Sequence, residues 1–155
     1  MELHEALRPL AFLLGTWRGT GTGRYPGIDD FEYAEEARFW HLGRPVLAYS
    51  QRTWSPASGA PMHSEMGFWR PAPGGVEVVL AHAFGITETC SGSIEGQAIA
   101  LRSLTLESTP TAKRVGAVGR SIEVAGDTLT YEVQMAFGDN ELQPHLAARL
   151  ERAPD

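Results

Sequence analysis

The feature that most constrains the fold of this chain is a succession of strand-length segments joined by short turns. The turns, such as YPGIDD and FGDNELQP, are rich in the Gly, Pro, Asn and Asp residues that chain reversals require. The pattern begins after Gly15 and persists almost to the end of the chain. We predict ten strands, over residues 17–23, 31–40, 46–54, 62–70, 75–82, 86–94, 98–108, 115–124, 128–137 and 145–152.

No segment long enough for a crossover helix separates these strands, so neighbours should pair antiparallel, as hairpins. Residues 128–137 alternate cleanly, with Leu129, Tyr131, Val133, Met135 and Phe137 on one face and Thr128, Thr130, Glu132 and Gln134 on the other. Closing the sheet removes its exposed edges. We therefore predict an all-β fold, a ten-stranded antiparallel up-and-down β-barrel of the lipocalin kind with a short N-terminal helix. A sandwich of two sheets is the alternative.

The N-terminal segment has the spacing of a short helix. Its apolar residues, Leu3, Leu7, Leu10 and Leu14, recur at helical intervals, and Pro9 limits the regularity of that helix. It leads into the motif GTWRGTG at 15–21, in which three glycines surround Trp17. Glycine allows close backbone approach, so Trp17 either plugs one end of the barrel or contacts a ligand.

The last predicted strand is ambiguous from its pattern alone. Leu142, Leu146 and Leu150 repeat every fourth residue, and Pro144 suits the first turn of a helix. Residues 145–152 are therefore compatible with either a helix or a strand.

Composition narrows the classes of function. The 155 residues fit one domain, spanning 1–155, and a formal charge of -6 without a basic cluster disfavours nucleic acid as a partner. The longest apolar stretch, 10–14, is far shorter than the roughly 20 residues that span a bilayer, so no membrane is expected. Cys90 is the single cysteine, and no apolar leader follows the start of the chain, so we expect a cytoplasmic protein.

The five histidines are the candidate ligands for a metal, but none has the spacing of a zinc motif. His145 follows Pro144, whose rigid backbone would help to aim a single axial ligand, and His63 follows the polarisable Met62. For any one of them, a surface or hydrogen-bonded core position is the simpler interpretation. The residues alone indicate a barrel that either binds a ligand or is empty.

Several longer motifs resemble the nitrobindin family of heme-binding β-barrels, which are related in shape to fatty-acid-binding proteins. The resemblance runs from about residue 7 to residue 152 and is carried by GTWRGTG at 15–21, GRYP at 23–26, GRPVLAYSQRTW at 43–54, PMHSE at 61–65, TAK at 111–113 and LQPHLAARL at 142–150. It implies that the last segment is a strand. It also implies one ferric b-type heme per chain, with His145 as the axial ligand of the iron and thereby the catalytic residue.

The same resemblance implies the other cofactor-binding residues. Met62 and His63 would lie near the heme without binding iron, Met135 and His82 would line the pocket, and Lys113 would approach a propionate. Relatives commonly carry Thr where this chain has Gly27, so heme binding is expected to be weaker unless a neighbour such as Arg24 substitutes.

By resemblance, the chain is expected to isomerise peroxynitrite to nitrate and to bind nitric oxide, with these small molecules as its partners. One alternative is a carrier or sensor of heme or nitric oxide that catalyses nothing. Another is a heme-free barrel that binds an apolar ligand, which Gly27 keeps open. A homodimer is a further possibility that the sequence does not decide.

Overall fold

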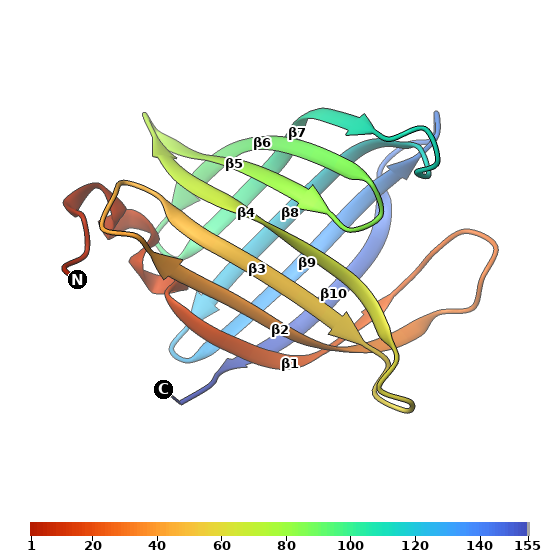
Figure 1. Ribbon diagram of the computed structural model, residues 1–155, viewed down its shortest axis with the longest axis horizontal. Coiled ribbons are helices and arrows are strands. Elements are labelled where there is room, and N and C mark those ends of the chain that lie inside the picture. Colours follow the sequence, from red (N-terminus) through yellow and green to blue (C-terminus); the bar gives the residue numbers. More distant parts are fainter. Residues whose placement is uncertain (155) are drawn as a thin grey trace.

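The chain forms one closed barrel of ten antiparallel strands with a short helix at one end (Figure 1). The computed structural model describes residues 1–154. Its strands are β1 (Gly15–Gly23), β2 (Phe31–His41), β3 (Leu47–Trp54), β4 (Pro61–Ala72), β5 (Gly75–His82), β6 (Ile86–Glu95), β7 (Ala98–Ser108), β8 (Val115–Ala125), β9 (Thr128–Phe137) and β10 (Gln143–Arg152). Asp155, the last residue of the predicted domain, lies outside the described residues.

Each strand pairs with its neighbours in the sequence, and β1 pairs with β10 to close the sheet. The closing register sets Trp17 opposite Arg152 and Gly23 opposite Leu146. The all-β prediction of an up-and-down barrel is confirmed, and the alternative of two packed sheets is wrong. Residues 143–152 form a strand, because Ala148 and Leu150 are buried in alternation with exposed neighbours.

The glycines of β1 allow aromatic side chains of β2 to lie close against its backbone. A Cβ atom at Gly21 would collide with the ring of Tyr33, and one at Gly23 would collide with the ring of Phe31. These strands pair residue for residue, with Gly21 opposite Tyr33 and Gly23 opposite Phe31. Glycine is therefore required here by close approach.

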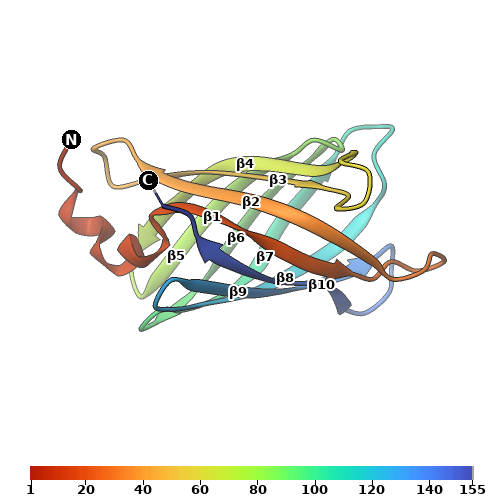
Figure 2. The same cartoon turned by 90° about the horizontal axis from the view of Figure 1, so that it is seen from below.

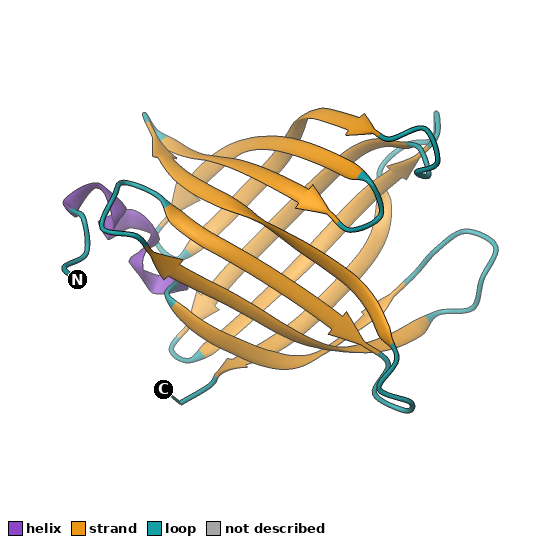
Figure 3. Cartoon of the chain, viewed as in Figure 1, coloured by secondary structure: helices purple, strands orange, loops and turns teal. Residues whose placement is uncertain are grey.

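The N-terminal helix, η1 (Glu5–Leu13), is a 3-10 helix that lies against one end of the barrel (Figures 2 and 3). Its fully buried residues are Leu7, Leu10 and Leu13, spaced three apart because a 3-10 helix has three residues per turn. The prediction of a helix is confirmed, but the expected fourth position, Leu14, is only partly buried. An α-helical spacing was wrong for this element.

Trp17 plugs the barrel at the same end. Its side chain is fully buried, and its indole Nε1 donates a hydrogen bond of 2.8 Å to the carbonyl oxygen of Leu13. The guanidinium of Arg152 lies 4.1 Å from the centroid of the indole ring. Of the two interpretations of the GTWRGTG motif, the structure therefore favours the plug.

The opposite end of the barrel carries the longer loops, including 24–30 and 109–114 (Figure 1). In this up-and-down order β1, β3, β5, β7 and β9 end there, and β2, β4, β6, β8 and β10 begin there. We call this end the mouth. Within residues 1–154, no helix is long and apolar enough to cross a membrane.

Replacing Leu10 with alanine tests whether η1 is an integral part of the core. Leu10 is fully buried, so Leu10→Ala should lower the free energy of unfolding by about 2–5 kcal/mol through lost burial and a residual cavity. Leu104→Ala, at a side chain that is 65% exposed, should change it by no more than about 0.5 kcal/mol. Urea denaturation measures both, and equal effects would contradict the docking of η1.

Candidate functional site

His145 lies at an irregularity near the start of β10, at the mouth. The pairing of β10 with β9 shifts register between Pro144 and Leu146, so that His145 has no partner in that ladder. Two hydrogen bonds with Arg24 fix the residue instead. The backbone carbonyl oxygen of His145 accepts from the backbone N–H of Arg24 at 2.7 Å, and the ring Nδ1 of His145 donates to the carbonyl oxygen of Arg24 at 2.6 Å.

This second hydrogen bond determines which ring nitrogen can act as a ligand. With the proton on Nδ1, the lone pair of Nε2 is free, and no residue within 1–154 forms a hydrogen bond with it. Burial lowers the pKa of His145, and the charge of His63 lowers it further. The imidazole is therefore neutral at pH 7, the state in which it binds a metal.

Two aromatic rings hold the His145 imidazole in place. Phe137 and Tyr25 meet it edge to face, with ring centroids 5.4 and 6.4 Å away, and they also contact one another at 4.6 Å. The ammonium of Lys113 lies 4.6 Å from the centre of the Tyr25 ring. The mouth therefore combines one free imidazole nitrogen, two aromatic rings and one cation.

The remaining predicted residues are placed as follows. Met62 is partly buried and packs on the hydrophobic core, and Met135 is partly buried on β9 opposite Gln143. Gly27 occupies the loop before β2 with a φ of +85°, and a Cβ atom there would meet nothing within 4 Å. A side chain at position 27 thus has space but a strained backbone, which accounts for glycine in this chain.

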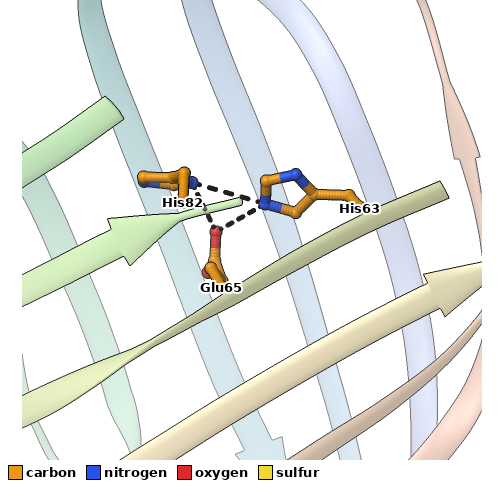
Figure 4. A group of neighbouring side chains, drawn as sticks. All are labelled: His63, Glu65 and His82. Carbon is orange, nitrogen blue, oxygen red and sulfur yellow. Dashed lines mark hydrogen bonds and ion pairs between the residues drawn. The ribbon is translucent and has the colours of Figure 1, made fainter. Parts of the chain in front are cut away.

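His63 and His82 form a second cluster together with Glu65 (Figure 4). His63 Nε2 lies 3.0 Å from Glu65 Oε2, His82 Nδ1 lies 3.1 Å from the same oxygen, and the two ring nitrogens are 3.3 Å apart. The cluster follows from strand geometry. His63 and Glu65 share one face of β4, and Glu65 pairs directly with His82 of β5.

This cluster continues into the barrel through Glu88. His82 Nε2 lies 2.9 Å from Glu88 Oε1, and the guanidinium of Arg120 donates to both oxygens of Glu88 at 2.6 and 2.8 Å. Burial alone would raise the pKa of Glu88, but these hydrogen bonds hold it at about 2. Burial opposes the charging of His82 as well, yet its two carboxylate partners raise its pKa to about 9.

A third polar cluster surrounds Glu35, which is almost fully buried. Tyr131 donates to Glu35 Oε2, Gln51 Nε2 donates to Glu35 Oε1 at 3.2 Å, and the hydroxyls of Tyr131 and Tyr33 are 2.7 Å apart. No cation pairs with Glu35 among the hydrogen bonds and ion pairs of residues 1–154. Burial therefore raises its pKa to about 7.

The structure thus brings the predicted residues together in two groups. Lys113 joins His145 through Tyr25, and His82 joins His63 through Glu65. Among the described residues, no hydrogen bond, ion pair or aromatic contact links Gly27, Met62 or Met135 to His145. Sequence reasoning missed Glu65, Glu88 and Arg120. The alternation His63-x-Glu65 in β4 was a usable signal for Glu65. Glu88 of β6 and Arg120 of β8 have no such signal, because they meet only in the folded sheet, over the intervening strand β7.

An open depression of about 840 Å³ is lined by residues of β1, β2 and β6 to β10, most of them exposed, with Ile99, Ile122 and Tyr131 among its apolar members. His145 does not line it. The chemistry of the mouth therefore rests on the side chains described above rather than on this volume.

Comparison with known proteins identifies the family. Residues 6–152 match the model of the THAP4-like, heme-binding beta-barrel domain. The chain belongs to this family. The resemblance to nitrobindins predicted from the sequence is thereby confirmed.

Relatives extend this assignment over nearly the whole chain. A Mycobacterium avium protein named peroxynitrite isomerase 2 is 50% identical, with 97% of each chain covered, and a Nocardia farcinica peroxynitrite isomerase is 50% identical over 98% of this chain and 94% of its own length. The crystal structure of Rv2717c from M. tuberculosis superimposes with a TM-score of 0.91 and 46% identity, over 99% of this chain and 100% of that chain.

The residues at the mouth fit heme, the cofactor for which this family is named. The free Nε2 of His145 is a suitable axial ligand, and its Nδ1 hydrogen bond to a backbone carbonyl is the second contact that orients metal-binding histidines. Tyr25 and Phe137 offer apolar faces to a flat ring system, and Lys113 offers a cation to a carboxylate.

Glu35 predicts a specific pH dependence of stability. The folded state holds the Glu35 proton up to about pH 7, whereas the unfolded chain releases it near pH 4.5. The contribution of protonated Glu35 to the free energy of unfolding is therefore fully present below pH 4.5 and is lost as the pH rises through about 7. Glu35→Gln should remove this loss, which amounts to about 3 kcal/mol at most. Urea unfolding at a series of pH values measures it. Glu32→Gln, an exposed position of β2, is the control, and an unchanged profile in Glu35→Gln would contradict the assignment.

Proposed function

We propose that this protein binds one ferric b-type heme per chain at the mouth of the barrel and isomerises peroxynitrite to nitrate. The observation that carries the proposal is His145, whose Nε2 is free while its Nδ1 is fixed by Arg24. Support from relatives is consistent, because proteins that are about half identical over their whole length are named peroxynitrite isomerases.

His145 is the proposed axial ligand, and Arg24 is a positioning residue that acts through its backbone carbonyl. A fixed, neutral imidazole binds a metal without first losing a proton. Lys113, stacked on Tyr25, is the proposed partner of a propionate, and Phe137 supports the imidazole from β9. His63, whose charge acts on His145, is proposed to face the same volume.

When bound, ferric heme would be held by His145 and would supply a positively charged iron able to accept an anionic peroxide or nitric oxide as a ligand. The protein's own part is to hold that imidazole and to limit the access of water with its aromatic rings. Isomerisation leaves the atoms and charge of peroxynitrite unchanged, so no acid or base residue is required. Cys90, whose thiol pKa burial raises to about 12, is unsuited to act as a nucleophile.

The polar interior argues against the alternative of a heme-free barrel for apolar ligands. Glu35, Gln51 and Glu88 are buried among hydrogen-bonded partners inside the barrel. An apolar chain inserted beside these groups would displace their partners at a cost in desolvation. A heme carrier or sensor would use the same site, so only a kinetic measurement distinguishes it from the enzyme.

Titration with hemin tests the site. The wild-type chain should show a Soret change that saturates at one heme per chain, and His145→Ala should lose it because the axial nitrogen is gone. His41→Ala, at the far end of β2 near η1, is the matched control and should bind as the wild type does. Circular dichroism should confirm that all three are folded. Wild-type uptake by His145→Ala would refute His145 as the ligand.

Stopped-flow decay of peroxynitrite tests the activity. The heme-loaded chain should accelerate the decay in proportion to its concentration and raise the yield of nitrate, because the open iron position is the reactive element. Heme-free protein at the same concentration is the control and should match buffer. Equal decay with and without heme would remove the enzymatic function and leave the carrier or sensor.

A further inference from the structure

We propose that His63, Glu65 and His82 form a binding site for a divalent transition-metal ion, with Zn²⁺ as the best match, separate from the axial ligand His145. The three side chains come from the paired neighbouring strands β4 and β5, and their donor atoms lie close together at the mouth (Figure 4). Two imidazoles and one carboxylate are the ligand set of many catalytic zinc sites.

The spacing of the donor atoms fits a tetrahedral ion. The three distances among His63 Nε2, Glu65 Oε2 and His82 Nδ1 are 3.0, 3.1 and 3.3 Å. Ligands about 2.0–2.1 Å from a tetrahedral zinc lie about 3.3 Å from one another, so the ion would enter with shifts of a few tenths of an ångström. In His63 and His82 the nitrogens that face each other are the ones that would bind.

The groups behind these ligands are arranged as they are in metal sites. His82 turns its other nitrogen, Nε2, to the carboxylate of Glu88 at 2.9 Å, which is the carboxylate–histidine pairing that orients zinc ligands. The hydroxyl of Tyr49 donates to Glu65 Oε1 at 2.9 Å, which leaves Oε2 to face the histidines. Glu88 is in turn held by Arg120.

The local charge also favours a cation. A metal ion would have to displace the Nδ1 proton of His82, whose carboxylate partners raise its pKa to about 9. Once that proton has left, Glu65 and Glu88 supply two negative charges against the one positive charge of Arg120, so the site that receives the ion is anionic. Three protein ligands leave a fourth tetrahedral position for water or a small anion. The side chain of His63 is 26% exposed, so ions can reach the cluster from the mouth.

The experiment measures zinc on the full, heme-loaded chain by equilibrium dialysis against buffered Zn²⁺ and elemental mass spectrometry. One zinc per chain is expected, and X-ray absorption at the zinc edge should report nitrogen and oxygen ligands at about 2.0–2.2 Å. Less than stoichiometric zinc at micromolar free Zn²⁺ would overturn the proposal.

Variants assign the ion to this cluster. His63→Ala and Glu65→Gln should each abolish stoichiometric binding, and Tyr49→Phe, which removes only the hydroxyl behind Glu65, should weaken it about 10-fold. Tyr49→Phe keeps the aromatic packing, so it remains informative if a ligand variant fails to fold. Zinc binding that is unchanged in His63→Ala would overturn the site.

His145→Ala is the matched control from the same mouth. It should lose heme and keep zinc, whereas Glu65→Gln should lose zinc and keep heme. The two sites are thereby tested independently, and failure of one leaves the other measurable. Loss of zinc in folded His145→Ala would show that the ion depends on the axial ligand and would overturn a separate site.

Discussion

The pairing of β1 with β10 is the constraint on which the rest of the structure depends. It closes the sheet, so that the backbone groups along both terminal strands find partners. It also sets Gly23 opposite Leu146, which brings the loop after β1 beside the start of β10. The two hydrogen bonds between Arg24 and His145 follow directly from this closure. Residues more than a hundred positions apart in the sequence thus build the candidate heme site.

The two ends of the barrel have different roles because different side chains fill them. At one end, Trp17 and the leucines of the inner face of η1 form an apolar plug whose side chains are fully buried. Toward the mouth, charged groups are buried, and each of Glu65, Glu88 and His82 is stabilised by a specific partner. Paired charges of this kind are costly to separate, so they hold side chains in fixed orientations. Side chains held in fixed orientations suit an axial ligand and a metal site, whereas a flexible apolar pocket would not hold ligand atoms in place.

The sequence predicted most of the fold because the relevant signals were local. Turn residues and strand alternation placed the first nine strands to within a few residues, and the GTWRGTG motif left a plug and a ligand contact as alternatives, of which the structure favours the plug. Two local features were not decided by pattern. The spacing of leucines suggested an α-helical repeat where a 3-10 helix formed around Pro9, and residues 142–150 fitted a helix as well as a strand. In the second case, pairing with β1 and β9 on both sides determined the outcome.

For the site, the residues by themselves indicated His145 after a rigid proline and His63 after Met62, and the family resemblance added His82 and Lys113. Their partners were decided only by the tertiary structure. Strand register set Glu65 against His82, and the order of the strands brought Arg120 of β8 to Glu88 of β6 over β7. The unpaired position of His145 in its ladder allowed it to reach Arg24. The physical reason is that hydrogen bonds and pKa values depend on distances between strands, which no spacing along the chain encodes.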